Sequence, residues 1–144
     1  MFLESLSSTI LLGKDFAKQL VPKSKVLLKG PIGAGKTSFV KGIAEGLMIK
    51  ENITSPTFGL SHHYESGTIP LIHIDLYRLT NALSAEELFL EEEEEIENNQ
   101  GILIIEWPEL IMPLINNSWL IKIDYANEKG REINIYQPTD FKNF

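Results

Sequence analysis

Apolar residues recur at the spacing of a helix near the start of the chain. The positions are Leu11, Leu12, Phe16 and Leu20, and charged residues stand between them. This pattern predicts an amphipathic helix over residues 5–20, which ends before Pro22. A second apolar stripe predicts another helix over residues 36–47. Its members are Phe39, Val40, Ile43, Ala44 and Leu47.

Shorter apolar runs without helical spacing predict buried strands. They cover residues 25–29, 71–76 and 102–105, and a further candidate strand covers residues 57–64. Runs of this length are typical of strands that are buried on both faces of a sheet. Asp75 lies in one run and Glu106 follows another directly. Because parallel strands bring their carboxyl ends to one edge of a sheet, both acids are predicted to lie at the edge where ligands bind.

Two further patterns complete the expected set of elements. Ser84 and Glu87 have the spacing of a capping box, which predicts a third helix over about residues 84–99. Residues 120–135 alternate between polar and apolar side chains on either side of a turn at residues 127–130. This alternation predicts a C-terminal antiparallel hairpin. Helices that alternate with short apolar strands indicate the α/β class.

Composition narrows the class of protein. The chain has 144 residues, of which 43% are hydrophobic and 23% charged, so we expect one compact domain over residues 1–144. It has no cysteine, which excludes disulfides, thiolate metal sites and a cysteine nucleophile. The first basic residue is Lys14, and no apolar run reaches the length of a membrane span. We therefore expect a soluble cytoplasmic protein without an export signal or a membrane role.

The acidic charge is concentrated in one segment. The net charge is −7, and eight of the 20 acidic residues lie within residues 86–97. The rest of the chain is nearly neutral and lacks the broad basic surface that tight nucleic-acid binding requires. Any contact with RNA is therefore expected to go through a partner. The run of glutamates at residues 91–95 fits either a solvated helix face or a surface for a basic partner.

A phosphate-binding motif lies between the first predicted strand and the second predicted helix. The residues GPIGAGKT, from Gly30 to Thr37, match the P-loop pattern in this required context. Its glycines let the backbone turn its amides toward an anion, and the helix N-terminus adds positive potential. Lys36 is predicted to reach the β and γ phosphates and Thr37 to bind Mg²⁺. We therefore predict a three-layer sandwich like that of P-loop NTPases, with a mainly parallel central sheet and the C-terminal hairpin.

Hydrolysis would need further groups beside a P-loop. The candidates are Asp75 and Glu106, which could instead be structural acids paired with a nearby Lys or Arg. The histidines His62, His63 and His73 lack the spacing of known zinc motifs, so a metal site there is disfavoured. Trp107 and Trp119 fit core or edge aromatics, although Trp107 adjoins Glu106 and could shape the nucleotide pocket. These alternatives cannot be separated by spacing alone.

Four motifs in one order give the chain a resemblance to a known family. They are the P-loop, SPTF at residues 55–58, HIDLYR at residues 73–78 and IEWPE at residues 105–109. With these the chain resembles the TsaE family, formerly known as YjeE, over nearly its whole length. The resemblance implies an ATPase required for threonylcarbamoyladenosine in tRNAs that read codons beginning with A. It further implies that this ATPase acts with TsaD and TsaB, does not transfer the carbamoyl group itself and keeps that machinery turning over.

The resemblance also assigns roles to individual residues. Asp75 matches the acid needed for hydrolysis, and Thr37 with Glu106 would hold Mg²⁺. Thr9 matches a threonine close to the base, and Arg131 matches a nucleotide-binding arginine in a GRE motif. The residues that would wrap the phosphates are Gly33, Ala34, Gly35, Lys36, Thr37 and Ser38. SPTF resembles a switch segment. ATP and Mg²⁺ are thus the expected cofactors, TsaD and TsaB the expected partners, and the isolated chain is expected to be a monomer.

Three other functions compete with this one. A GTPase is disfavoured because the chain has no NKxD motif and because LYR follows Asp75. A small nucleoside or nucleotide kinase usually needs a basic lid, for which this chain offers only Arg78 and Arg131. A non-hydrolysing ATP-dependent binding module is the alternative of a different class. Two acids near the P-loop argue against it, since binding alone would not require both.

Overall fold

The computed structural model describes residues 1–56 and 61–138. Within these residues the chain forms one sheet of seven strands, three α-helices and three short 3₁₀ turns. The strands are β1 (Phe2–Leu3), β2 (Lys25–Lys29), β3 (Ser61–Tyr64), β4 (Leu71–Asp75), β5 (Ile102–Glu106), β6 (Trp119–Tyr125) and β7 (Arg131–Tyr136). The helices are α1 (Leu6–Phe16), α2 (Lys36–Gly46) and α3 (Ala82–Asn99), and the turns are η1 (Ala17–Gln19), η2 (Pro108–Leu110) and η3 (Met112–Leu114). The expected α/β class is confirmed.

The sheet has a parallel centre and antiparallel edges. Its order is β1-β7-β6-β2-β5-β4-β3, in which β6, β2, β5 and β4 run parallel to one another. The hairpin of β6 and β7 is confirmed as antiparallel, with Ile121 opposite Ile135. Strands β1 and β3 also pair antiparallel with their neighbours. The expectation of a mainly parallel sheet therefore holds for the four central strands, while the sheet as a whole is mixed.

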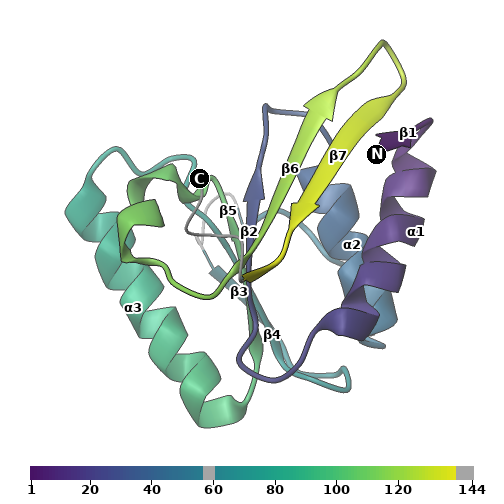
Figure 1. The fold of residues 1–144 in the computed structure, drawn as a ribbon. Helices are drawn as coiled ribbons and strands as arrows, with labels where there is room; N and C mark the ends of the chain where they lie inside the picture. The colour runs from purple at the N-terminus through teal and green to yellow at the C-terminus, as the bar shows by residue number, and fades with distance from the viewer. Residues whose placement is uncertain (57–60, 139–144) are drawn as a thin grey trace.

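Helices cover both faces of this sheet. Figure 1 shows α1 and α2 together on one side of the strands and α3 on the other. Alternate residues of β5 divide between the two cores: Ile102 and Ile104 pack toward α1 and α2, whereas Leu103 and Ile105 pack toward α3. A strand buried on both faces has no polar face to show, which is why these residues appear in the sequence as a continuous apolar run.

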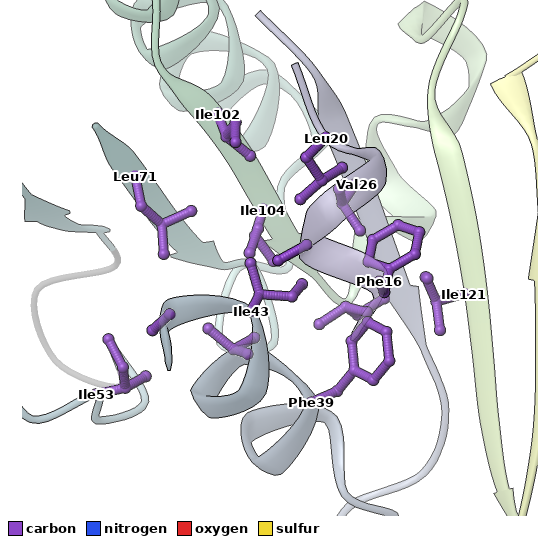
Figure 2. Close-up of a cluster of buried hydrophobic side chains, with 14 of the residues drawn as sticks. Phe16, Leu20, Val26, Phe39, Ile43, Ile53, Leu71, Ile102, Ile104 and Ile121 are labelled. Atoms are coloured by element: carbon purple, nitrogen blue, oxygen red, sulfur yellow. The ribbon is translucent and has the colours of Figure 1, made fainter. Parts of the chain in front are cut away.

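The core between the sheet and the first two helices holds α1 close to α2. The ring of Phe16 packs against Phe39 at 5.5 Å and edge-on against Trp119 at 5.0 Å between centroids, as Figure 2 shows for the surrounding cluster. The helices also touch backbone to backbone, because a Cβ on Gly42 would lie 2.1 Å from the carbonyl oxygen of Ile10. Trp119 is thus a partly buried aromatic that packs against this core, within the core or edge positions expected from the sequence.

Two element boundaries differ from the sequence prediction. The capping box at Ser84 is wrong, because α3 begins at Ala82 and is capped by Asn81, whose Oδ1 accepts from the backbone N–H of Leu83 at 2.8 Å. Asparagine is among the best N-cap residues. Because Asn81 caps the helix three residues earlier, Ser84 lies inside the first turn and is not its cap. The first helix ends its α-helical part at Phe16 and continues as η1. The candidate strand over residues 57–64 is present as β3, and its first four positions lie outside the described residues.

The glutamate run is partly structural. Glu92 is buried and its Oε2 lies 2.6 Å from Nε2 of His63, on edge strand β3. The neighbouring Glu93 accepts from Nζ of Lys25 at 2.8 Å. These two contacts tie α3 to the sheet, while Glu91 and Glu94 are exposed. The run is therefore a solvated face only in part, and its use as a surface for a basic partner stays a prediction. None of the described helices combines the length and apolarity that a bilayer crossing would require.

Candidate functional site

The predicted site residues meet at the carboxyl ends of three neighbouring strands. Glu106 ends β5 and pairs in register with Leu28 of β2 on one side and with Asp75 of β4 on the other. The P-loop begins at the same end of β2, directly after Lys29. A pocket of about 340 Å³ opens here. The predicted residues that line it are Gly33, Gly35, Lys36, Thr37, Ser38, Asp75 and Glu106.

The loop backbone has the shape of an anion cradle. Gly33 and Gly35 take φ values of 78° and 114°, which side chains strongly disfavour. At Gly33 an added Cβ would also lie 2.5 Å from the Tyr125 hydroxyl oxygen. Gly35 then starts α2, whose first amides have no acceptor within the helix. Such amides, together with the helix dipole, bind phosphate groups, so the loop fits a nucleotide's phosphates.

Lys36 is held against its own loop. Its ammonium donates to the carbonyl oxygens of Gly30 at 2.6 Å and Pro31 at 2.8 Å, and lies 4.4 Å from the ring centroid of Trp107. Burial lowers the pKa of Lys36, and the carboxylates of Glu106 and Asp75 oppose this shift. A phosphate would offer the same ammonium charged acceptors in place of neutral carbonyls, which strengthens each hydrogen bond. The side chain is therefore positioned for transfer to a phosphate.

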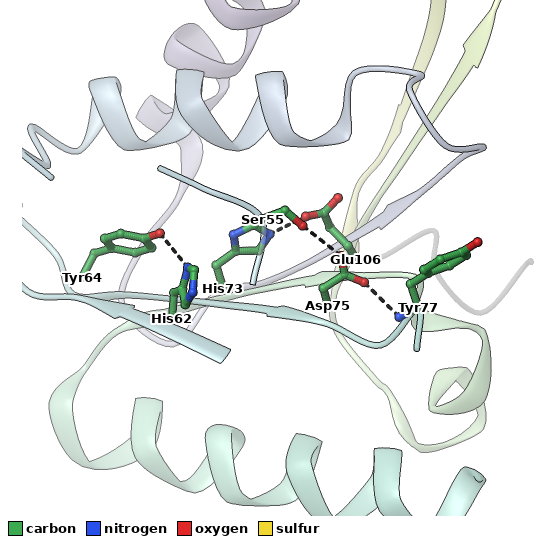
Figure 3. Close-up of polar contacts among 7 residues, drawn as sticks. All are labelled: Ser55, His62, Tyr64, His73, Asp75, Tyr77 and Glu106. Carbon is green, nitrogen blue, oxygen red and sulfur yellow. Dashed lines mark hydrogen bonds and ion pairs between the residues drawn. The ribbon is translucent and has the colours of Figure 1, made fainter. Parts of the chain in front are cut away.

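Asp75 combines partial burial with hydrogen bonds that fix its carboxylate. Its oxygens accept from the Tyr77 backbone N–H at 2.9 Å and from the Ser55 hydroxyl at 3.2 Å (Figure 3). Burial raises the pKa of Asp75, the hydrogen bond from Tyr77 opposes the rise, and the nearby Glu106 adds to it. A carboxylate of raised pKa beside a phosphate loop is suited to accept a proton from a water molecule.

Glu106 is the more deeply buried of the two acids. It is 2% exposed, and its Oε2 lies 2.5 Å from Nε2 of the buried His73. Its carboxylate and the Thr37 hydroxyl are hard oxygen ligands of the kind that Mg²⁺ prefers. Across the described parts of the chain, no group of three or more His, Cys, Asp or Glu residues could hold a metal ion by itself. A Mg²⁺ ion here would need phosphate oxygens and water as further ligands, as is usual for nucleotide-bound magnesium.

Arg131 reaches the loop from behind. Its Nε donates to the Ala34 carbonyl at 2.8 Å and its Nη2 to the Gly33 carbonyl at 3.3 Å, while its guanidinium lies 4.6 Å from the Tyr125 ring centroid. The Tyr125 hydroxyl donates to the Ile32 carbonyl at 2.7 Å. The β6–β7 hairpin thus holds three successive carbonyls of the P-loop. Arg131 contacts the loop backbone and is not among the residues that line the pocket, so its binding to a nucleotide stays a prediction.

The remaining predictions fall in different places. Thr9 is fully buried in α1, where its hydroxyl donates to the Ser5 carbonyl at 3.3 Å, and it lies beside Gly35. Its closeness to a base stays a prediction. Trp107 lines the pocket, and its ring centroid lies 4.8 Å from that of Tyr77. Of the two positions expected for this residue, the structure therefore favours the one in which it shapes the pocket. In the SPTF segment, residues 57 and 58 lie outside the described residues.

Sequence analysis gave no role in this site to His73, which contacts Glu106, or to Tyr125, which contacts the loop. His73 stands two positions before Asp75, and alternation along a strand would have placed both on one face. Tyr125 ends the first strand of the hairpin, where the alternation alone gives no reason to expect a contact with a loop 93 residues away. The first residue could have been found from the strand pattern. The second required knowledge of which strands are neighbours.

Comparison with known proteins gives one consistent result. Residues 3–133 match the family model described as threonylcarbamoyl adenosine biosynthesis protein TsaE. A protein of Synechocystis sp. named tRNA threonylcarbamoyladenosine biosynthesis protein TsaE is 44% identical over 78% of this chain and 72% of its own length. Proteins of the same name from Nostoc sp. and Aquifex aeolicus are 42% and 34% identical, over 94% and 95% of this chain and 83% and 95% of their own. A crystal structure of Bacillus subtilis YdiB superposes with a TM-score of 0.78 at 28% identity, over 99% of this chain and 88% of that one.

Proposed function

The chain belongs to the TsaE family, and we propose that it binds and hydrolyses ATP in the biosynthesis of threonylcarbamoyladenosine in tRNA. One observation carries the ATPase part of this proposal. The P-loop, Asp75 and Glu106 come from three separate stretches of sequence and meet around one pocket. We also propose that the fold is the three-layer α/β sandwich of P-loop NTPases.

The loop would hold the triphosphate. The backbone amides of residues 33–38 would donate to phosphate oxygens, and Lys36 would exchange the carbonyls of Gly30 and Pro31 for the β and γ phosphates. Thr37 and Glu106 would bind Mg²⁺, which when bound neutralises phosphate charge. Arg131 and Tyr125 hold the carbonyls of the loop, which would help it to keep its shape around the phosphates.

Asp75 would act on the attacking water. Its carboxylate is fixed by Tyr77 and Ser55, so its free lone pairs keep a constant direction toward the pocket. Accepting a proton from water makes the water a better nucleophile, and the raised pKa of Asp75 favours that transfer. Lys36 would stabilise the charge that develops on the phosphate oxygens.

The hydrolysis is proposed to serve another enzyme. The chain would act in the cytoplasm on the complex of TsaD and TsaB, be monomeric when isolated, and meet tRNA only through that complex. Ser55 belongs to the SPTF segment and donates to Asp75, so a change at the phosphates could reach this segment through one hydrogen bond. The ATP-bound and ADP-bound forms of the protein would then present different surfaces to the partners.

Asp75→Ala tests this cycle. The variant keeps the phosphate loop and should bind ATP, while hydrolysis should fall by about 100-fold or more because the proton acceptor is lost. It should support one round of tRNA modification with TsaD and TsaB but not repeated rounds. Multiple-turnover assays on unmodified tRNA, with wild-type protein and with ATP or ADP, measure this directly. Normal multiple turnover by Asp75→Ala would show that hydrolysis does not reset the complex.

Arg131→Met tests whether the hairpin holds the loop for binding. The variant leaves the Gly33 and Ala34 carbonyls without their guanidinium donors, so ATP affinity should fall by about tenfold, equal to about 1.4 kcal/mol. Calorimetric titration with ATP measures the change. Lys129→Met, at an exposed position in the turn of the same hairpin, is the matched control and should bind normally. An unchanged affinity in Arg131→Met would mean that the loop keeps its shape unaided.

A further inference from the structure

His73 is a fully buried histidine in contact with the deepest acid of the site. It lies in the middle of β4 with no exposed surface, and its Nε2 is 2.5 Å from Oε2 of Glu106. Its other ring nitrogen, Nδ1, is buried and has no hydrogen-bond partner in the described residues. All of its polar contact is therefore directed at Glu106. Burying an imidazole with one nitrogen unpaired is costly, so the contact it does make requires an explanation.

The register of the sheet explains how the two side chains meet. His73 pairs with Ile104 and Asp75 pairs with Glu106, so His73 and Glu106 are diagonal neighbours on one face of the β4–β5 pair. That face looks toward α2 and the P-loop, as Figure 3 shows. The hydrogen bond runs along the sheet surface and holds Glu106 from its inner side, away from the open pocket.

His73 holds the Glu106 carboxylate by only one of its two oxygens. A carboxylate can only accept, so Nε2 of His73 is the donor to Oε2 of Glu106 in this contact. The bond uses Oε2 and leaves Oε1 for another ligand. A side chain held at one oxygen cannot rotate freely about its last torsion, and its second oxygen then keeps one direction.

From this geometry we infer that His73 is a positioning residue that orients the carboxylate of Glu106 for the metal ion of a bound nucleotide. The inference rests on the proposed function. It adds a residue that contacts neither nucleotide nor metal and acts through Glu106 alone. Groups in this outer position typically change metal affinity by about 10 to 100-fold when they are removed.

The chain contains a second histidine–glutamate pair, more exposed at its histidine, against which this role can be judged. His63 and Glu92 also join by Nε2 and Oε2, at 2.6 Å, but they connect β3 to α3 on the opposite face of the sheet. Neither of them lines the pocket. If His73 served only to satisfy a buried glutamate, removing either histidine would affect folding and leave the metal dependence of nucleotide binding unchanged.

The experiment compares nucleotide affinity with and without Mg²⁺. Calorimetry with a non-hydrolysable ATP analogue is carried out in Mg²⁺ and in EDTA for the wild type, His73→Gln, His73→Asn and His63→Gln. The glutamine amide can reach the place of Nε2, whereas the shorter asparagine reaches only the place of Nδ1. Asparagine should therefore reduce affinity in Mg²⁺ by about tenfold and leave affinity in EDTA nearly unchanged, glutamine should restore most of the loss, and His63→Gln should match the wild type.

Each result decides the question. Equal losses in Mg²⁺ and EDTA, or equal behaviour of His73→Asn and His73→Gln, would overturn the positioning role while leaving the proposed function in place. A wild-type protein whose affinity does not depend on Mg²⁺ would overturn both. Thermal melting of each variant identifies a folding defect. Should His73→Asn fail to fold, His73→Leu takes its place, because leucine fills the buried space and cannot donate a hydrogen bond. It should lose about tenfold in affinity in Mg²⁺ but not in EDTA, and wild-type affinity in Mg²⁺ would overturn the positioning role.

Discussion

Replacement of Lys36 by alanine is expected to lower ATP affinity by at least about 100-fold, equal to about 2.7 kcal/mol. In the proposed function the ammonium is the cation that binds the phosphates, and charge-assisted hydrogen bonds of this kind are each worth about 1.5 to 3 kcal/mol. Its present partners, the carbonyls of Gly30 and Pro31, show that it already points into the turn of the loop. Calorimetric titration with ATP and Mg²⁺ measures the loss.

Two further variants separate the charge of Lys36 from its packing. Lys36 is only 5% exposed and lies over Trp107, so alanine also removes buried contacts. Lys36→Met keeps most of the aliphatic side chain over the ring and should lose affinity to the same extent. Lys41→Ala, at an exposed position of the same helix, should bind as the wild type does. Wild-type affinity in Lys36→Met would remove the assignment of this residue to the phosphates.

Glu106→Gln is expected to reduce Mg²⁺-dependent ATP hydrolysis by about 100-fold or more while reducing ATP binding much less. The amide has the shape of the carboxylate, and its oxygen can still accept from His73, so the fold and the phosphate cradle should persist. The negative charge toward the metal is lost. Phosphate release under saturating ATP reports the first effect, and calorimetry reports the second.

Glu109→Gln is the control for this substitution. Glu109 follows in the same segment, is exposed, and lies close enough for its charge to act on Lys36. A general loss of negative charge near the pocket would affect both variants, whereas loss of a metal ligand should affect Glu106→Gln alone. Equal losses of binding and hydrolysis in Glu106→Gln would instead identify Glu106 as a structural acid.

The sequence was sufficient for those parts of the site that depend on short stretches of chain. The P-loop needs only a strand, a glycine turn and a helix, and local pattern predicts all three. Asp75 and Glu106 could be assigned to strand ends because buried strands are apolar on both faces and stop abruptly at an acid. Parallel strands then bring these ends together whatever their order in the sheet.

Contacts between distant stretches could not be predicted in the same way. The place of Arg131 behind the loop depends on β6 lying next to β2, which no local pattern specifies. Glu92 is an intermediate case. It occupies the buried helical stripe that includes Phe89 and Ile96, so its position in the stripe indicated a buried acid in need of a partner. The surrounding glutamates hid that signal, and its partner His63 comes from another strand.

The position of β2 in the sheet also determines when the site can form. Its neighbours in the described sheet are β5 and β6, with Lys25 opposite Leu103 and Val26 opposite Trp119, so the strand that carries the P-loop pairs with strands that come much later in the sequence. Such long-range pairings form late in folding. A ribosome therefore completes the P-loop motif before it makes β5, β6 and β7, and the growing chain acquires Glu106 and Arg131 only as these later strands emerge. A nascent chain, or one that stops before β5, would carry the motif without the pocket.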